Sequence, residues 1–545
     1  MKLPLYAPLP TPDEMRQWDQ MASSDHAMPP ALLMENASRE ALHVLTSLVP
    51  LQQNSRILVF MGRGNNGGDG AALARSLHNL GYRVLVCDFT KGTPLKDPAK
   101  KHVLMAKKAG VAFCPFMQDE DITLPVEWRH PDIVIDALAG TGLSGPLRQW
   151  EQDIIAAINT HRNSAFIFSL DVPSGLCAMR GLPQPVAVQA HATVSFEAGK
   201  PGLFIPEAQK YTGAVYVRGI GLPLAVKAAL PASWQLLQPE PGAWASPPPG
   251  LHKGRAGKVL IIGGSFGMAG APVLACLGAL RCGAGLVTLL TVNGEYASSS
   301  GLYPEIMVKP LVKGKQWTAT TIPAVLANIR KFSPSAIVIG PGMGRTSGTG
   351  AVVQAILQMQ GRCPVVVDAD ALYSVRSTHS CKYPLTARDV LTPHPGEMAA
   401  MLPLAFFQES ADNAPTEHVA LVQRNRPKAL ATFLETCPAV TVLKGAGTLI
   451  ARQGMPVTLS PHDVPALAVG GSGDVLAGVV GALLARGHSA YDAACLGVHV
   501  HARAGGILSA RAPQGHLARD IAEALPVAWA ELCPENTPAS FGNKA

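Results

Sequence analysis

The chain has 545 residues, of which 48% are hydrophobic and 15% are charged, and its formal net charge at pH 7 is +7. This composition excludes a disordered or collagen-like protein and is typical of a globular chain with more than one core. The positive charge is spread thinly, in pairs such as Lys100 and Lys101, so it does not favour nucleic-acid binding.

The cysteines and the apolar runs together predict a location. Ten cysteines lie scattered without a CxxC pair or a metal-ligand spacing, a pattern typical of free thiols in a reducing compartment. No apolar run approaches the roughly 20 residues that a membrane span needs, and the N-terminus lacks a signal-type apolar core. We therefore expect a cytoplasmic protein with no membrane partner.

The first elements are predicted to be helices over residues 11–49, a buried strand over Arg56–Met61 and a helix from Ala71 onward. A glycine-rich loop, Gly62–Gly70, connects the last two. Its N–H groups can bind a pyrophosphate at the carboxyl end of a parallel strand, and Asn65, Asn66 and Asp69 add side-chain oxygens. The alternative is a purely structural turn.

Two later strands end in an aspartate followed by a glycine-rich turn. They are the runs 133–136 and 165–171, which end at Asp136 and Asp171. Because the carboxyl ends of parallel strands meet at one sheet edge, three polar loops should converge there. We predict a site for a hard cation or a sugar phosphate, with any metal bound through oxygen. Strands over 192–196 and 214–217 complete this domain.

These residues resemble the NAD(P)H-hydrate epimerases over about the first 220 residues. The motifs that carry the resemblance are Gly64–Gly70, Asp136–Gly142, Asp171–Gly175 and Lys200–Gly202. The resemblance implies a Rossmann-like three-layer domain that interconverts the R and S hydrates of NADH and NADPH (NADHX and NADPHX). It also implies a potassium ion held by Asn66, Asp136 and Ser174.

The same resemblance implies contacts to the hydrate. Asp171 would face the reacting ring as a catalytic residue. The hydrate pyrophosphate would lie on Asn65, Asn66, Gly67, Gly68 and Asp69 and on Gly140, Thr141, Gly142, Leu143, Ser144, Gly145 and Pro146. One position departs from the family pattern, because Cys177 stands where an aspartate is common.

A second α/β domain is predicted after a proline-rich passage. We place an epimerase domain at 1–223, a linker at 224–251 and a second domain at 252–545. The second domain repeats the pattern of buried strands with polar loops. Its strands are expected at 257–263, 286–290, 336–340, 364–368 and 440–444.

The stretch Val469–Gly478 is predicted to be an anion-binding turn at a helix N-terminus. Glycines at 470, 471 and 473 leave the backbone N–H groups accessible, and the apolar run 475–485 is typical of a buried helix. A carboxylate there, Asp474, can accept a proton beside the anion, which suits phosphoryl transfer to a hydroxyl. The alternative is a packing turn in which Asp474 merely occupies the first helical turn.

The order of motifs over residues 235–530 resembles the ADP-dependent NAD(P)H-hydrate dehydratases, a family with a ribokinase-like fold, and the whole chain is similar to the two-domain hydrate repair enzymes. The resemblance implies that ADP is a co-substrate, and we expect Mg²⁺ to bridge its phosphates. It implies that Asp474 is the base. The implied nucleotide contacts are Lys444, Gly445, Ala446, Gly447, Thr448 and Gly473. The implied hydrate contacts are Ala271, Gly342, His394 and Asp474. Val464 stands where the family usually has asparagine, so Asp463 or His462 substitutes, or the nucleotide is held less tightly.

Two other classes of function stay open at this point. One is a small-molecule kinase of ribokinase-like fold fused to a nucleotide-binding module, since fold alone does not fix chemistry. The other is an N-terminal domain that binds a ligand or a protein without catalysis. We also expect a homo-oligomer, whose subunit number the sequence does not give.

Overall fold

The computed structural model divides into two compact units. One comprises Ala7–Leu236 and the other comprises Met1–Tyr6 with Leu237–Ala545. The structure describes residues 6–90, 92–116, 124–142, 145, 147–239, 250–292, 303–311, 314, 316–375, 385–408 and 414–533. The proline-rich passage, which covers residues 240–249, lies outside this part, but the segment predicted as a linker also contains a helix, Leu224–Ala229, and a strand, Trp234–Leu237.

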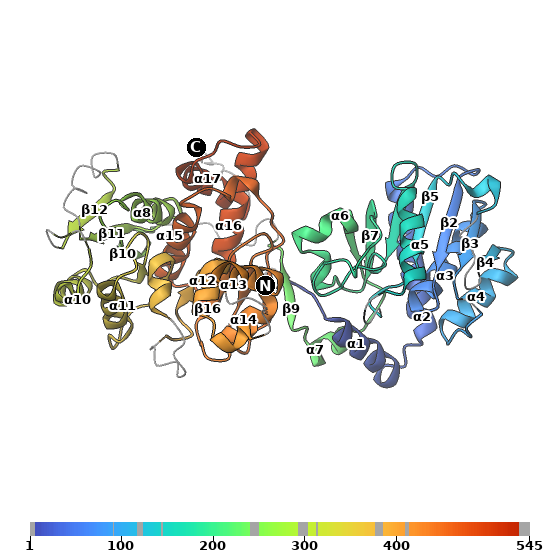
Figure 1. Cartoon of the computed structure of the whole chain (residues 1–545), viewed down its shortest axis with the longest axis horizontal. Helices are drawn as coiled ribbons and strands as arrows, with labels where there is room; N and C mark the ends of the chain where they lie inside the picture. The colour runs from blue at the N-terminus through green and yellow to red at the C-terminus, as the bar shows by residue number, and fades with distance from the viewer. Residues whose placement is uncertain are drawn as a thin grey trace, which may run out of the picture. The chain divides into compact units, whose positions relative to one another are not determined.

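The first unit is built on a seven-stranded sheet in the order β4-β3-β2-β5-β6-β7-β8, with every pair parallel (Figure 1). Its elements are α1 (Pro12–Asp25), α2 (Pro30–Leu48), β2 (Arg56–Met61), α3 (Asn65–Asn79), β3 (Arg83–Asp88), α4 (Ala99–Lys108), β4 (Ala112–Pro115), β5 (Ile133–Ala137), α5 (Gln149–Thr160), β6 (Phe166–Leu170), β7 (Ala192–Phe196), α6 (Gln209–Thr212), β8 (Ala214–Arg218) and α7 (Leu224–Ala229).

The side chains of β2 alternate between the two faces of the sheet, which explains the three layers of this unit. Val59 and Met61 belong to a core shared with helices α1 to α4, whereas Leu58 and Phe60 belong to a second core shared with α5. Successive residues of a strand point to opposite faces, so a run that is apolar throughout must be covered on both sides. This confirms the predicted α/β architecture.

The second unit has a larger sheet, ordered β1-β9-β18-β17-β16-β15-β14-β13-β10-β11-β12. The pairs from β16 to β12 are parallel, and β17 and β18 are added antiparallel. Strands β1 (Tyr6–Pro8) and β9 (Trp234–Leu237) each span a boundary between the residue ranges of the two units. The elements that lie wholly within the second unit are β10 (Lys258–Ile262), α8 (Gly270–Arg281), β11 (Leu286–Thr291), β12 (Ile306–Pro310), α10 (Ile322–Phe332), β13 (Ala336–Ile339), α11 (Ser347–Leu357), β14 (Val365–Val367), β15 (Val390–Leu391), α12 (Pro395–Met401), α13 (Pro415–Arg424), α14 (Arg426–Leu434), β16 (Val440–Leu443), β17 (Leu449–Ala451), β18 (Val457–Leu459), α15 (Ser472–Ala485), α16 (Ala490–Arg511) and α17 (Ala518–Ala530).

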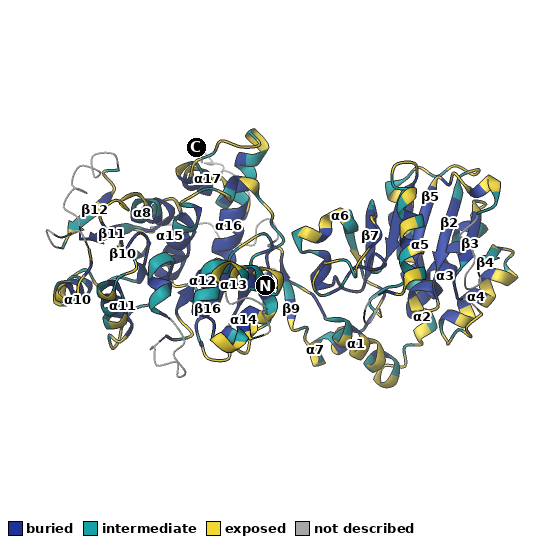
Figure 2. Cartoon of the chain, viewed as in Figure 1, coloured by how far each residue is buried: buried dark blue, intermediate teal, exposed yellow. Residues whose placement is uncertain are grey.

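Helix α15 is buried along most of its length between α8, α16 and the sheet. A Cβ on Gly478 would lie 1.9 Å from the carbonyl oxygen of Ala275, and a Cβ on Gly278 would lie 2.2 Å from that of Val475. These glycines let α8 and α15 approach backbone to backbone. Figure 2 shows the result as dark blue strands and inner helices, with exposed residues on the outer faces of helices such as α4 and α10.

Both sheets reverse their strand order next to a strand that opens a glycine-rich loop. In the first unit the order reverses between β2 and β5, and in the second it reverses between β10 and β13. Open α/β sheets bind ligands outside the carboxyl ends of their strands at such points. The fold thus places the loops after β2, β5, β10 and β13 where ligands are expected.

Candidate active sites

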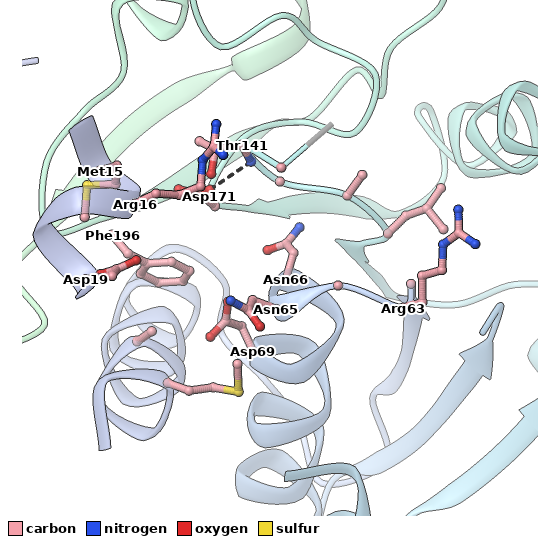
Figure 3. Close-up of a pocket in the computed structure, with 18 of the residues that line it drawn as sticks. Met15, Arg16, Asp19, Arg63, Asn65, Asn66, Asp69, Thr141, Asp171 and Phe196 are labelled. Atoms are coloured by element: carbon pink, nitrogen blue, oxygen red, sulfur yellow. Dashed lines mark hydrogen bonds between the residues drawn. The ribbon is translucent and has the colours of Figure 1, made fainter. Parts of the chain in front are cut away.

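A cavity of about 970 Å³ opens at the strand-order reversal of the first unit (Figure 3). The loops after β2, β5 and β6 contribute to its wall, and helices α1 and α2 close the opposite side. Its lining mixes apolar and polar side chains, and the polar ones include Asn65, Asn66, Asp69, Asp171 and Lys200. Leu143, Ser144 and Pro146 lie outside the described residues.

Helix α3 begins at Asn65, so the prediction of a loop reaching Gly70 was wrong. The glycines explain the early start, because a Cβ on Gly67 would lie 1.9 Å from the carbonyl oxygen of Gly62, and one on Gly70 would lie 2.4 Å from the Cβ of Ala137. Gly67 and Gly70 therefore allow close packing of the first turns of α3. Gly64 caps this helix without a side-chain hydrogen bond, which leaves the first-turn N–H groups available to an anion.

Asn66 is buried to 6% exposure, and neither polar atom of its side chain has a hydrogen-bond partner among the described residues. Such a group costs roughly 1–3 kcal/mol when left unpaired, so it points to a ligand. A Cβ on Gly140 would lie 3.0 Å from Asp171 Oδ2 and 3.4 Å from the Asn66 side chain. Gly140 therefore leaves Asn66 and Asp171 open to a common space.

Asp136 is fully buried at the end of β5 and accepts four hydrogen bonds. Ser174 donates from Oγ at 2.5 Å and from its backbone N at 2.8 Å, Ser169 Oγ donates at 2.9 Å, and Leu138 N donates at 3.3 Å. Burial nevertheless raises the pKa of Asp136 above its ordinary value. The structure brings Asp136 and Ser174 together, as the sequence predicts.

Asp171 is held in a strained backbone conformation by an ion pair. Its φ is +62°, which non-glycine residues rarely adopt. Lys200 Nζ donates to its Oδ1 at 2.5 Å, and Thr141 N donates to its Oδ2 at 3.2 Å, the contact dashed in Figure 3. Lys200 is only 1% exposed and also donates to Ser195 Oγ at 3.0 Å. Lys200 belongs to the motif Lys200–Gly202, but the sequence alone predicts no role for it.

Two more carboxyl groups share this cavity. Asp69 lies in the second turn of α3, where burial and the nearby Asp171 raise its pKa well above the ordinary value. Asp19 lies on α1 and lines the cavity, and no pattern in the sequence connects it to the distant strand-end motifs. Cys177, in contrast, does not line the cavity, and its carbonyl packs where a Cβ on Gly202 would lie, at 2.4 Å.

The glycine-rich turn that the sequence predicts at the start of a buried helix is present in the second unit. Gly471, with φ +92°, is the N-cap of α15, and Asp474 lies in the first turn. A Cβ on Gly473 would lie 3.2 Å from Lys444 Nζ, so glycine at this position leaves room for the ammonium group beside the turn. The structure therefore brings together Lys444, Gly473 and Asp474.

Lys444 lies among carboxyl groups from three elements: Asp368 after β14, Glu397 on α12 and Asp474 on α15. Its Nζ donates to Asp368 Oδ1 at 3.0 Å and lies 3.7 Å from Glu397 Oε2. Burial opposes a charged lysine here, but Asp368 and Glu397 outweigh it and raise the pKa of Lys444. Burial, and next the charge of Asp368, raise the pKa of Asp474 to about 7. A carboxylate with such a pKa is suited to accept a proton near neutral pH.

His394 serves as the N-cap of α12. Its Nδ1 accepts from Gly396 N at 3.0 Å, and its Nε2 lies 3.5 Å from Glu397 Oε1. Burial lowers the pKa of His394, which favours the neutral ring. Glu397, which sequence analysis assigned no role, thus connects His394 to Lys444.

Gly342, in the loop after β13, lies next to Ala271, in the first turn of α8. Gly342 has φ +63°, and a Cβ there would lie 2.5 Å from the carbonyl oxygen of Met268 and 3.4 Å from the Cβ of Ala271. The loops after β10 and β13 therefore pack backbone to backbone. This close approach requires glycine at position 342.

The loop Lys444–Thr448 is held from the side by the segment after β18. Gly447 N donates to the carbonyl oxygen of His462 at 3.2 Å, and His462 Nε2 lies 3.3 Å from His499 Nδ1 on α16. Asp463 is exposed, whereas His462 is half-buried. Of the two proposed substitutes for the family asparagine, His462 is the one in contact with this loop.

The described residues contain neither a metal-ligand cluster nor a membrane-spanning helix. No group of three His, Cys, Asp or Glu side chains is arranged to hold a metal ion. Within the same residues, no helix combines the length and the apolar character that a bilayer crossing requires.

Comparison with known proteins gives matches in both units. Residues 259–527 match the family model described as NAD(P)H-hydrate dehydratase, and residues 30–202 match that of the YjeF-related protein N-terminus. Curated relatives include the bifunctional NAD(P)H-hydrate repair enzyme of Moorella thermoacetica, 33% identical over 541 residues (95% of this chain, 96% of the relative). The enzyme of the same name from Escherichia coli K12 is 32% identical over 513 residues (93% and 91%).

A similar solved structure is the ADP/ATP-dependent NAD(P)H-hydrate dehydratase of Bacillus subtilis, crystallised with ATP and Mg²⁺. It is 27% identical, with a TM-score of 0.42, and the match covers 53% of this chain and 94% of that chain. The relatives that match along nearly the full length of the chain show its family. The chain belongs to the family of bifunctional NAD(P)H-hydrate repair enzymes.

Proposed function

We propose that this protein repairs hydrated nicotinamide cofactors at two separate sites. The first unit epimerises the R and S forms of NADHX and NADPHX. The second unit dehydrates the S form to NADH or NADPH at the expense of ADP, with AMP and phosphate as products. The observation that supports this most directly is Asp474, a carboxyl group with a pKa of about 7 in the first turn of α15, beside the Lys444 ammonium.

In the second unit, Asp474 takes the proton of the ring hydroxyl while the hydroxyl oxygen attacks the terminal phosphorus of ADP and AMP departs. The N–H groups of Gly473 and its neighbours stabilise the transferring phosphoryl group, and Lys444 neutralises further charge. The ring nitrogen then expels phosphate, and loss of a proton from the adjacent carbon completes the dihydropyridine. No phosphorylated product should accumulate, because the leaving group is on the carbon next to nitrogen.

We assign the surrounding contacts of this site as the resemblance implies. The loop Lys444–Thr448 holds the nucleotide, and Ala271, Gly342 and His394 contact the hydrate. Mg²⁺ would be held by the nucleotide phosphates with one or two carboxylates such as Asp368, and would neutralise phosphate charge.

In the first unit, the hydrate pyrophosphate would lie on residues 65–69 at the N-terminus of α3 and on residues 140–146, with the ring next to Asp171. A potassium ion would be held by Asn66, Asp136 and Ser174. The unpaired, buried Asn66 amide and the oxygen-only donor set fit a hard cation of this type. Bound there, potassium would supply positive charge near the substrate without redox or acid–base chemistry of its own.

The domain boundaries, assembly and location belong to the same proposal. We propose an epimerase domain over 1–223, a linker over 224–251 and a dehydratase domain over 252–545, in a cytoplasmic homo-oligomer. Light scattering of the purified protein measures the subunit number directly.

The test supplies S-hydrate with ADP or with ATP and follows AMP, phosphate and NADH together. We expect ADP to suffice and AMP to form in a 1:1 ratio to recovered NADH. A strict requirement for ATP with a stable phosphoester product would instead indicate a small-molecule kinase. A second assay supplies R-hydrate alone, and failure to convert it to S-hydrate would indicate an N-terminal unit that binds without catalysis.

A further inference from the structure

One carboxyl group in the cavity of the first unit, that of Asp19, is assigned by no comparison. Asp19 points from α1 into this cavity (Figure 3). Helix α1 precedes the residues that match the family model, which begin at residue 30. Among the described residues, Asp19 makes no side-chain hydrogen bond and no ion pair, whereas Asp171 is paired with Lys200.

Helix α1 is fixed firmly enough to position Asp19. Thr11 caps it by accepting from Glu14 N at 3.2 Å, and Glu14 Oε2 accepts from Thr11 N at 2.8 Å. Trp18, the neighbour of Asp19, is fully buried and its Nε1 donates to the carbonyl oxygen of Leu230 at 2.7 Å. A capped helix with a buried tryptophan anchor holds the next side chain in a defined direction.

Charged groups from several elements face Asp19. They are Asp69 on α3, Asp171 after β6, and Glu197 and Lys200 after β7. Lys227 on α7 pairs with Glu197. Arg16, on α1 itself, also lines the cavity. Although Asp19 is open to the cavity, the surrounding protein desolvates it. This desolvation, opposed by Lys200 and reinforced by Asp171 and Glu197, raises the pKa of Asp19 to about 6.

Epimerisation of a hemiaminal by exchange of its hydroxyl needs two proton transfers. The departing hydroxyl takes up a proton as the C–O bond breaks and the ring nitrogen forms a C=N⁺ bond. A water molecule then adds to the other face and gives up a proton. The net change is inversion at one carbon, with one water released and one consumed, so one acid and one base suffice.

We propose that Asp19 and Asp171 form this acid–base pair, with Asp19 protonating the departing hydroxyl and the Asp171 carboxylate accepting the proton of the incoming water. This inference depends on the epimerase activity proposed above. In the reverse direction the two residues exchange roles. The active enzyme therefore carries one proton between the two carboxyl groups, and after each turnover this proton returns from Asp171 to Asp19 through solvent. Lys200, which donates to Asp171 Oδ1, holds the Asp171 side chain in place.

The test compares Asp19→Asn, Asp19→Glu and Asp13→Asn with the unaltered chain. Asp13 lies on the same helix but is exposed and paired with Arg16, so it is the matched control. We expect Asp19→Asn to lower kcat for R-to-S conversion by on the order of 100-fold or more, with Asp19→Glu partly restoring it. In the unaltered enzyme the rate should fall as pH rises above about 6, because the shared proton is lost, and this limb should vanish in Asp19→Asn.

The same preparations distinguish the possible failures. ADP-dependent dehydration and the thermal unfolding temperature should stay unchanged in Asp19→Asn, since the residue faces a cavity in the other unit. An unchanged kcat, a rise in KM alone, or a lowered kcat with the pH limb intact would each overturn the acid–base role of Asp19. Absence of R-to-S conversion by the unaltered chain would instead reject the epimerase assignment.

Discussion

The two sites each hold one lysine against an aspartate at the end of a buried strand, but they differ in what that lysine can reach. Lys200 is 1% exposed and is enclosed by Asp171, Ser195 and the backbone of Phe196. Lys444 pairs with Asp368 and still lies against Gly473 of the anion-binding turn. One lysine therefore fixes the charge of a carboxylate, and the other can also stabilise a phosphoryl group.

The glycines of the two turns also differ in whether they serve packing or leave room for a charged group. Gly67 and Gly70 of the first unit serve the packing of α3, whereas Gly471 and Gly473 form the helix cap and leave room for Lys444. In the proposed mechanism, similar glycine-rich sequences thus serve proton transfer in one unit and phosphoryl transfer in the other. The following predictions test this difference, beginning with the largest expected effect.

Asp474→Asn should lower ADP-dependent dehydration by on the order of 10²–10⁴-fold and leave R/S interconversion intact. The amide keeps the size of the side chain but cannot accept the hydroxyl proton. NADH absorbance measures the first activity, and separation of the R and S hydrates measures the second. Near-normal dehydration by this variant would remove Asp474 from the mechanism.

The pH dependence of dehydration follows from the same residue. A base works only when deprotonated, so a pKa of about 7 predicts that kcat/KM rises with pH up to about 7 and levels off above it. Asp474→Asn should abolish this dependence in its residual activity.

Lys200→Met should destabilise the first unit by roughly 3–5 kcal/mol, because it leaves the Asp171 carboxylate, 14% exposed, without its ion-pair partner. Lys444→Met should cost less stability, since its partner Asp368 keeps the hydrogen bond from Thr392 Oγ1 at 2.6 Å, and should mainly weaken ADP binding. Denaturant unfolding and ADP titration measure the two effects. Equal losses of stability would contradict the contrast drawn between the lysines.

Asp136→Ala should weaken epimerisation by at least about 10-fold and reduce its dependence on potassium, without changing dehydration. Asp136→Asn is the milder companion, because it keeps the volume and some of the hydrogen bonds from Ser174. Rates in potassium and sodium salts give the measurement. Equal rates of the unaltered enzyme in both salts would exclude the proposed cation site.

His462→Ala should raise the Kd for ADP by only about fivefold, the equivalent of one hydrogen bond of about 1 kcal/mol. Alanine keeps the backbone carbonyl of residue 462 that accepts from Gly447 N, so the loss is limited to the side-chain contact with His499 that fixes this segment beside the Lys444–Thr448 loop. Asp463→Ala is the matched control, because this neighbour is exposed, and it should leave the Kd unchanged.

The positions of most strands follow from the sequence because a buried parallel strand must be apolar on both faces. Arg56–Met61 and Ala192–Phe196 are strands over the predicted residues, and Asp136 and Asp171 come at strand ends where a ligand site is expected. The sequence did not predict short strands that lack such a run, including β12, β15 and β17. Sheet pairing rather than composition forms these strands.

Only the tertiary structure decided which charges meet. Lys444 and Asp368 are 76 residues apart, and Asp19 reaches the cavity of Asp171 from a helix near the N-terminus. No periodicity connects such pairs, because strand order and loop packing bring them together. The start of α3 at Asn65 has the same origin, since only the close approach of Gly62 and Ala137 explains glycines inside a helix. The sequence by itself thus determined the strands and their polar ends, and packing across the sheets determined which side chains form each site.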